Sequence, residues 1–251
     1  MNNTMEHILI IRAVGLLAQL KNKTVVMETD SVEMIEPIRD AVQVNNSLFC
    51  IKLHLNQDIT SIPFVEEWQN IPLVIYPNGL GTVRDFVGLM PMLKKLNVKF
   101  YLDGAVKQSY ETVQILSSLG VYSGIVINEK ADWEKLTDLM YYALCGKVKH
   151  APIEPFQYVF DMYRRNVLVD YGTVFFENKE RFEVFSTEGT KNAEETQRKL
   201  WQKFFYEATP CATCAGWRIC MGKYAGLEDK TGCQNFTVEL LNLIESIKFK
   251  N

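Results

Sequence analysis

The chain has 251 residues, of which 47% are hydrophobic and 23% are charged. This is the composition of a globular protein, and a chain of this length buries about 70 to 75% of the surface that its unfolded form exposes. One large or two modest domains fit that length. The formal net charge of −3 excludes the strongly basic surface of a typical nucleic-acid-binding protein, so we expect no nucleic-acid partner.

The N-terminal apolar run predicts neither a membrane span nor a secretory signal. It extends from Ile8 to Leu20, is interrupted by Arg12, and is shorter than the roughly 20 residues that cross a bilayer. Glu6 and His7 precede it, which is not the basic start of a signal peptide. We therefore expect a cytoplasmic protein with reduced thiols and no membrane partner, and we interpret residues 6–20 as a helix packed on a sheet.

The next part of the chain alternates short apolar runs with amphipathic stretches, which is typical of βα units on a parallel sheet. The expected strands are residues 24–28, 48–53, 73–76, 98–102 and 123–127. The expected helices are residues 31–42, 83–96, 110–119 and 133–144. Five such units cannot close an eight-stranded ring. We therefore predict an α/β fold with a partial barrel-like parallel sheet of about five strands.

Pro152 and Pro155 lie three residues apart and interrupt any helical or strand pattern. They predict a boundary between a first domain, residues 1–150, and a second, residues 151–251. In the second domain, residues 167–176 and 181–185 favour an antiparallel hairpin or three-stranded meander. Residues 193–207 and 236–249 have the apolar spacing of amphipathic helices.

Polar residues follow the predicted strands at the edge where α/β folds bind their ligands. They form a residual substrate groove or serve only as helix caps and turn residues, and we favour the second interpretation. None of them has a partner in the sequence that identifies it as catalytic or cofactor-binding. The residues are Glu28, Asp30, His54, Asn56, Asn78, Asp103, Asn128 and Glu129.

Four of the six cysteines lie in the last fifth of the chain, with the spacing C-x2-C-x5-C-x12-C. Reduced thiols at such spacing bind a metal more often than they form disulfides. We therefore predict one metal site, formed by Cys211, Cys214, Cys220 and Cys233. Cys50 and Cys145 stand alone in apolar surroundings, and we expect both to be buried and unpaired.

The spacing also bears on the identity of the metal. Zinc ribbons usually repeat the short C-x2-C knuckle, which occurs once here. A five-residue gap followed by a longer one suits the larger envelope of a [4Fe–4S] cluster held by four thiolates. We favour the iron–sulfur cluster and keep zinc as the alternative.

Several short motifs occur in the order that characterises one known family. Asn78-Gly79 and Leu102-Asp103-Gly104 each follow a predicted strand, and Trp201 precedes Pro210-Cys211 and the other cysteines. The chain resembles radical SAM enzymes with a SPASM extension. The resemblance implies a partial barrel followed by a small α+β SPASM-like domain with a hairpin and a four-cysteine loop. It also implies that the four cysteines are the ligands of the second of two SPASM clusters.

The chain departs from this family at the residues that perform its chemistry. The sequence contains no C-x3-C-x2-C triplet, which in the family holds the cluster that cleaves S-adenosylmethionine. Residues 55–58 read Leu-Asn-Gln-Asp where the family has a Gly-Gly-Glu segment that contacts this cofactor. Tyr224 replaces a first-cluster cysteine, and we expect it outside the coordination shell. The resemblance therefore implies a pseudo-radical-SAM protein that does not bind S-adenosylmethionine.

Three hypotheses for function remain. The first is a non-catalytic accessory protein that binds one [4Fe–4S] cluster and a precursor peptide or partner maturase in peptide modification. The second is a redox-active enzyme or electron carrier that uses the same cluster. The third is a zinc-stabilised structural or interaction domain. We favour the first, and it assigns no catalytic residue.

Overall fold

The computed structural model describes residues 8–175, 182–186, 189–190, 210–224 and 227–248. The chain divides into two compact units. Unit 1 comprises Met1–Leu102 and Phe175–Glu194, and unit 2 comprises Asp103–Val174 and Glu195–Asn251. The predicted α/β class is confirmed, because each unit combines helices with parallel strands.

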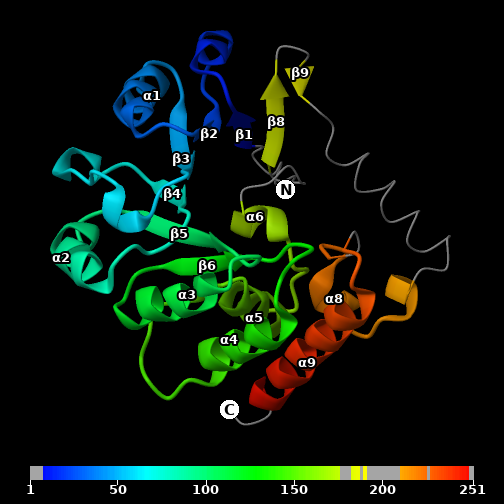
Figure 1. Ribbon diagram of the computed structural model, residues 1–251. Helices are drawn as coiled ribbons and strands as arrows, with labels where there is room; N and C mark the ends of the chain where they lie inside the picture. Colours follow the sequence, from blue (N-terminus) through cyan, green and yellow to red (C-terminus); the bar gives the residue numbers. More distant parts are fainter. Residues whose placement is uncertain (1–7, 176–181, 187–188, 191–209, 225–226, 249–251) are drawn as a thin grey trace. The chain divides into compact units, whose positions relative to one another are not determined.

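Unit 1 is built on an open parallel sheet (Figure 1). Its strands pair in the order β5-β4-β3-β2-β1-β8, all parallel, and β9 adds to β8 in the antiparallel sense. Their bounds are β1 Ile8–Ile11, β2 Thr24–Thr29, β3 Ser47–His54, β4 Leu73–Tyr76, β5 Val98–Asp103, β8 Phe182–Ser186 and β9 Gly189–Thr190. The predicted strands of this unit are all present. The sheet exceeds the prediction because β1 and β8 join it.

The helix predicted for residues 6–20 is wrong. Ile8–Ile11 forms strand β1, and only Val14–Gln19 is helical, as the 3₁₀ helix η1. All four residues of β1 are buried, and three of them are isoleucine, a β-branched residue that fits a pleated and covered surface. Buried strands carry continuous apolar runs, so this segment lacks the alternation that would have distinguished it from a helix.

The hairpin predicted after residue 167 is also wrong. Tyr171–Phe175 forms the short helix α6. Phe182–Ser186 is a strand, as predicted, but it pairs in parallel with β1, and its antiparallel partner is the two-residue strand β9. Strand pairing of this kind joins segments about 170 residues apart in the chain, and local sequence patterns do not encode it.

The helices of unit 1 that follow η1 include the two predicted at residues 31–42 and 83–96, and also two short 3₁₀ helices that were not predicted. They are η2 Val32–Met34, α1 Ile35–Gln43, η3 Ile59–Ser61, η4 Glu66–Trp68 and α2 Val83–Leu93. α2 begins where predicted because the Thr82 side chain accepts a hydrogen bond from the backbone N–H of Asp85, which is a standard N-cap. α1 begins four residues later than predicted, since η2 occupies the preceding turn. Its buried residues Ile35, Ile38 and Val42 lie at helical spacing.

Unit 2 is mostly helical. Strands β6 Ser123–Val126 and β7 Ile153–Glu154 pair in parallel. Its helices are α3 Gln108–Ser118, α4 Trp133–Cys145, α5 Phe156–Arg164, most of α6, η5 Pro210–Thr213, α8 Trp217–Cys220 and α9 Lys230–Lys248. The long α9 packs against α4, α5 and α8 (Figure 1). The Phe236 ring lies between Trp133 of α4, at a centroid distance of 5.7 Å, and Phe156 of α5, at 6.3 Å.

α9 begins six residues before the helix predicted at 236–249. Cys233 therefore lies in the first turn of this helix and not in the preceding loop. The predicted helix at residues 193–207 lies outside the described residues. Residue 150, where we predict a domain boundary, falls between α4 and α5, which pack together within unit 2. The two compact units are defined by the contacts within each of them. They do not test the predicted domains at residues 1–150 and 151–251, which stay a prediction.

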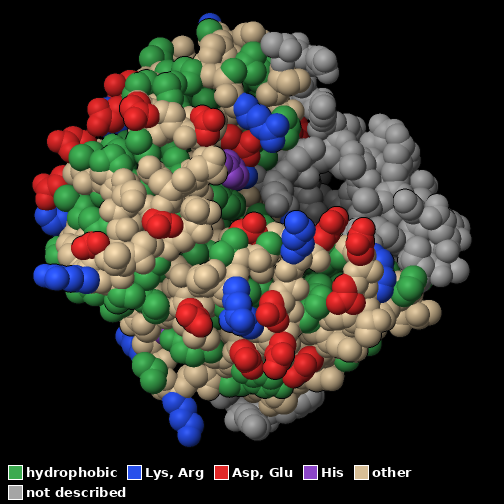
Figure 2. Space-filling view, viewed as in Figure 1, with side chains coloured by type: hydrophobic (Ala, Val, Ile, Leu, Met, Phe, Trp, Pro, Cys, Tyr) green, Lys and Arg blue, Asp and Glu red, His purple; other side chains and the backbone are tan. Residues whose placement is uncertain are grey.

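The surface agrees with the small net charge. Acidic and basic side chains are interspersed on the face in view, among hydrophobic and uncharged ones (Figure 2). Among the described residues, no helix is both long and apolar enough to cross a membrane.

Candidate functional site

The four cysteines predicted to bind metal all lie in unit 2, between η5 and the first turn of α9. Cys211 lies in η5, Cys220 is the last residue of α8, and Cys233 lies in the first turn of α9. Cys214 lies between η5 and α8. Cys220 and Cys233 are buried, Cys211 and Cys214 are half-buried, and all four are free thiols.

The four thiols are close enough to affect one another's ionisation. The pKa of Cys233 is raised to about 12, first by burial and then by unfavourable charge interaction with Cys220, Cys211 and Cys214. Burial also raises the pKa of Cys220 to about 11, with contributions of the same sign from Cys211 and Cys214. Neighbouring thiolates repel, so a bound cation would stabilise the ionised set.

The turn after α8 directs backbone donors at the Cys220 sulfur. The N–H groups of Gly222 and Tyr224 hydrogen-bond to this thiol and favour its ionised form. Cys220 is the last residue of the right-handed helix α8, and Met221 and Gly222 after it both have positive φ, at 48° and 76°. A right-handed residue followed by a left-handed one makes a concave nest of N–H groups, which binds anions and is common around iron–sulfur clusters. A left-handed conformation costs about 1 kcal/mol or more at a residue such as Met221.

α9 fixes the segment that carries Cys211 and Cys214. The Gln234 side chain donates to the Pro210 carbonyl at 3.1 Å. A Cβ atom placed on Gly216 would lie 2.3 Å from the Thr237 hydroxyl oxygen, so only glycine permits this close approach. The same hydroxyl lies 4.0 Å from the Cys214 sulfur. These contacts hold Cys214 beside the first turn of α9, where Cys233 lies.

Tyr224 is buried next to the cysteines. Its hydroxyl hydrogen-bonds to Tyr171 of α6, and its pKa is raised well above the usual value, first by burial and then by Tyr171, Cys220 and Cys233. The two rings meet edge to face at a centroid distance of 5.7 Å. The position of Tyr224 outside the coordination shell stays a prediction.

The described residues contain no group of three or more His, Cys, Asp or Glu side chains arranged as a formed metal site. The four thiols are neighbours, but they do not form a closed ligand shell. The four-cysteine metal site therefore stays a prediction. The identity of the bound group, an iron–sulfur cluster or zinc, stays a prediction as well.

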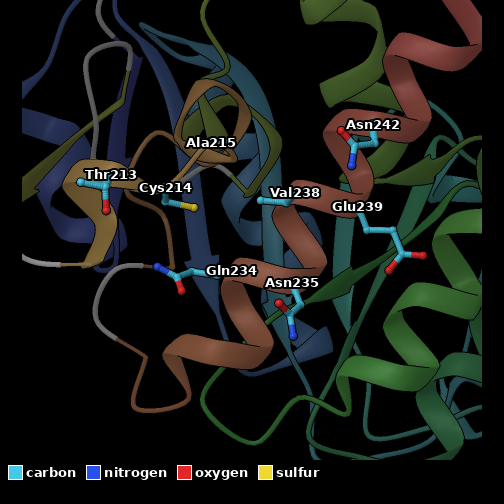
Figure 3. Close-up of a pocket in the computed structure, with 8 residues that line it drawn as sticks. All are labelled: Thr213, Cys214, Ala215, Gln234, Asn235, Val238, Glu239 and Asn242. Carbon is cyan, nitrogen blue, oxygen red and sulfur yellow. The ribbon is translucent and has the colours of Figure 1, made fainter.

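A surface pocket with a volume of about 520 Å³ adjoins Cys214 (Figure 3). One face of α9 forms one side, and the segment from Thr213 to Ala215 forms another. The Cys214 sulfur points toward Val238 across this pocket (Figure 3). Amide and other polar side chains dominate the lining, which comprises Thr213, Cys214, Ala215, Gln234, Asn235, Val238, Glu239 and Asn242. Side-chain amides both donate and accept hydrogen bonds, as a peptide main chain requires of its partner.

A second polar cluster lies in unit 1, at the carboxyl ends of its parallel strands. Glu28 of β2 accepts from Lys52 of β3 at 2.8 Å and from Arg12, the residue after β1, at 2.7 Å. Only 6% of the Lys52 side chain and 12% of the Glu28 side chain are exposed, against 72% for Arg12. Burial would raise the pKa of Glu28, but Lys52 and Arg12 outweigh it and the net pKa is lowered. Glu28 is therefore ionised and paired.

His54 lies beside this cluster, at the end of β3. Its ring stacks on Tyr76 at a centroid distance of 4.6 Å, and Tyr76 stacks on Tyr101 at 5.5 Å. Burial lowers the pKa of His54, Lys52 and Arg12 lower it further, and Glu28 opposes them. The imidazole is therefore neutral at neutral pH.

Two other strand-end residues act as turn residues, as we predicted for this group. Asp103 accepts from the Ala105 backbone N–H at 2.8 Å and from the Asn128 amide. Asn128 in turn accepts from the Lys130 backbone N–H at 3.0 Å. Such Asx turns are the default use of Asp and Asn after a strand.

The two single cysteines differ. Cys50 is buried in β3, as predicted, and burial raises its pKa to about 12. Cys145 is exposed, so the prediction that it is buried is wrong. It is the last residue of α4, and the residues that follow it, up to Lys149, are exposed as well.

Several residues around these sites were not predicted from the sequence. Lys52 did carry a signal, because a lysine within the apolar run Leu48 to Leu53 needs a buried partner. Tyr171, Gly216 and Thr237 carried none, since each acts through a contact with a distant segment.

Comparison of the chain with protein-family models, curated proteins and solved structures found no match.

Proposed function

We propose that the protein is a non-catalytic accessory member of the radical SAM/SPASM lineage that holds one [4Fe–4S] cluster and binds a precursor peptide or partner maturase. The convergence of four cysteines from η5, α8 and α9 on one part of unit 2 carries this proposal. Cys211, Cys214, Cys220 and Cys233 would hold the cluster through their thiolates.

The surroundings of Cys220 suit a thiolate ligand. Two backbone N–H groups hydrogen-bond to its sulfur, which stabilises negative charge that burial alone disfavours. Hydrogen bonds of this kind also tune the reduction potential of an iron–sulfur cluster. A bound cluster would supply a cross-link between α8 and α9 together with a capacity for one-electron transfer.

The non-catalytic part of the proposal depends on unit 1. In the family, a cysteine triplet follows the first strand of the barrel. Residues 12–23, which follow β1 here, contain no cysteine, and neither do residues 30–46 after β2. At the same edge of the sheet, Glu28 pairs with Lys52 and Arg12. The Lys52 ammonium and the Arg12 guanidinium at this edge disfavour a cationic sulfonium ligand such as S-adenosylmethionine.

The pocket beside Cys214 supports a peptide as partner. Asn235, Val238 and Asn242 lie at helical spacing along α9 and face it. Seven residues of helix rise by roughly 10 Å, which is the length of three residues of extended chain. Amides at both ends of such a stretch match the donors and acceptors of a peptide main chain.

Anaerobic purification followed by metal and sulfide analysis tests the proposal. We expect four iron and four sulfide per chain, because a [4Fe–4S] cluster contains four of each, together with the broad visible absorption of such a cluster. One zinc without sulfide would instead support the zinc-stabilised domain. Reversible reduction coupled to turnover of a substrate would support the redox hypothesis.

Calorimetry with S-adenosylmethionine tests the non-catalytic part separately. We expect no binding to the protein that carries its full metal content. Saturable binding with about one molecule per chain, together with cleavage to 5′-deoxyadenosine, would overturn the assignment as a non-catalytic protein, whatever the metal.

A further inference from the structure

A ring of hydrogen bonds surrounds the Cys220 turn. The Tyr171 hydroxyl donates to the carbonyl oxygen of Ile219 at 2.9 Å. Since this donation uses the only proton of the Tyr171 hydroxyl, Tyr224 is the donor in the hydrogen bond between the two tyrosines. The Tyr224 backbone N–H then donates to the Cys220 sulfur. The ring thus returns to the residue next to Ile219.

The position of Ile219 makes this ring effective. α8 is a single turn, Trp217–Cys220, so its last carbonyl groups lack a partner within the helix. Tyr171 satisfies one of them from α6, a segment about 48 residues away in the chain. Tyr171 is 1% exposed and Tyr224 is 2% exposed. No solvent replaces a hydrogen bond lost at such depth, and the polar group left behind keeps its full desolvation cost.

We propose that Tyr171 is a positioning residue for Cys220. Its hydroxyl fixes the Ile219 carbonyl, and through Tyr224 it fixes the backbone donor that points at the Cys220 sulfur. The inference rests on the proposed metal site and assigns a role to a residue outside the cysteine motif. The Tyr171 hydroxyl bonds to the Ile219 carbonyl and not to a cysteine sulfur. It therefore acts on Cys220 through the peptide unit between Ile219 and Cys220.

The two tyrosines have unequal effects on this geometry. Tyr171→Phe removes the bond to Ile219 and leaves the Tyr224 hydroxyl buried without its acceptor. Tyr224→Phe removes one bond and leaves both the contact between Tyr171 and Ile219 and the backbone donation to Cys220 in place. We therefore expect the Tyr171 variant to lose more metal affinity than the Tyr224 variant.

Residues that orient metal ligands typically contribute 10- to 100-fold to metal affinity. We expect Tyr171→Phe to weaken Co²⁺ binding by about 10-fold or more, by the same reasoning. Tyr224→Phe should weaken it only a few-fold and leave the metal content at saturation unchanged.

Tyr110 provides a matched control in the same unit. It is 3% exposed, and its hydroxyl donates to the Gly104 carbonyl at 2.8 Å. Tyr110→Phe thus removes a buried hydroxyl with the same kind of acceptor, while no cysteine contributes to the shift of its pKa. Its stability loss should resemble that of Tyr171→Phe, and its Co²⁺ affinity should equal that of the unaltered protein.

The experiment titrates Co²⁺ into the reduced full-length protein and its three variants, in competition with a chelator. The thiolate-to-cobalt charge-transfer band gives the affinity, and the ligand-field bands report the coordination geometry. We expect altered ligand-field bands for Tyr171→Phe alone, together with the largest loss of Co²⁺ affinity among the three variants.

The possible failures are distinguishable. If the unaltered protein shows no thiolate-to-cobalt band, the proposed metal site itself is wrong. If the unaltered protein binds Co²⁺ and Tyr171→Phe binds it as tightly and with the same spectrum, the positioning role is overturned. Should Tyr171→Phe fail to fold, Tyr224→Phe decides: unchanged ligand-field bands with unchanged affinity would refute the ring of hydrogen bonds as a determinant of the site.

Discussion

The two polar clusters of the molecule balance their charges in opposite ways. In unit 1, Glu28 lies between Lys52 and Arg12, so the buried charges are compensated by the protein itself. In unit 2, four thiols lie near one another, and the pKa of Cys220 and that of Cys233 are raised partly by their neighbours. The first cluster pairs its charges within the protein, whereas burial and mutual repulsion disfavour ionisation of the thiols in the second.

The two units should therefore gain their stability from different sources. A buried ion pair is costly to break but contributes little beyond an apolar pair of the same size. A metal held by four thiolates contributes folding energy outright, because no such site exists in the unfolded chain. We therefore expect unit 1 to fold independently of metal and the α8–α9 region to depend on it.

The largest effect should follow from loss of a proposed ligand. Cys220→Ala should abolish stoichiometric metal binding and expose α9 to protease, while unit 1 stays resistant, because structural zinc sites contribute about 10–16 kcal/mol in small peptides. Metal analysis and limited proteolysis measure both effects. Cys145→Ala is the control, since this exposed cysteine lies outside the motif. Full metal content and an unchanged digestion pattern in Cys220→Ala would refute the four-cysteine site.

Breaking the ion pair of unit 1 should be the next largest effect. Glu28→Gln should destabilise the protein by about 3–5 kcal/mol, because it removes one partner of the buried ion pair that the Lys52 ammonium forms with Glu28 at 2.8 Å. Glu28→Leu combined with Lys52→Met should cost much less, since well-packed apolar residues often replace a buried pair without loss. Denaturant unfolding measures these free energies.

The exposed pair of Lys95 and Glu66 offers a control for the buried one. Its side chains are 54% and 63% exposed, so Glu66→Gln should leave the midpoint of unfolding unchanged within error. An equal loss in Glu28→Gln and Glu66→Gln would show that burial of the pair in unit 1 has no energetic role.

Acid should reproduce part of the ion-pair effect. The pKa of Glu28 is lowered in the folded protein, so its stabilising contribution is present above the unfolded pKa of about 4.5 and is lost as pH falls through the folded value. The unaltered protein should therefore lose stability below pH 4.5 more steeply than the Glu28→Leu/Lys52→Met protein. Parallel pH profiles of the two free energies of unfolding would contradict this assignment.

The smallest effects concern two glycines. Gly216→Ala should destabilise unit 2 by about 1–3 kcal/mol, as overpacking does, because its Cβ would lie 2.3 Å from the Thr237 hydroxyl. Gly88→Ala in α2 meets nothing within 4 Å and should stabilise unit 1 by about 0.5–1 kcal/mol. Thermal unfolding gives both values, and a stabilising Gly216→Ala would show that the contact with Thr237 is looser than described.

Sequence patterns alone predicted the α/β class, the positions of strands β2 to β6 and of helices α2 to α4, and the four cysteines as candidate metal ligands. Each of these depends on local signals, such as the spacing of apolar residues, the cap at Thr82 and the distances between cysteines along the chain. Local signals failed at β1, because a buried run of isoleucines has no periodicity to separate strand from helix.

Contacts between distant segments became known only from the folded structure. The pairing of β8 with β1, the sharing of Glu28 between Lys52 and Arg12, and the contact of Tyr171 with Ile219 all join segments far apart in the chain. Such contacts form because a buried polar group needs a hydrogen-bond partner. The sequence offers several distant residues that could each serve as that partner, and its local patterns do not distinguish among them. The packed units select one partner for each group, and that selection is what places Tyr171 beside the Cys220 turn.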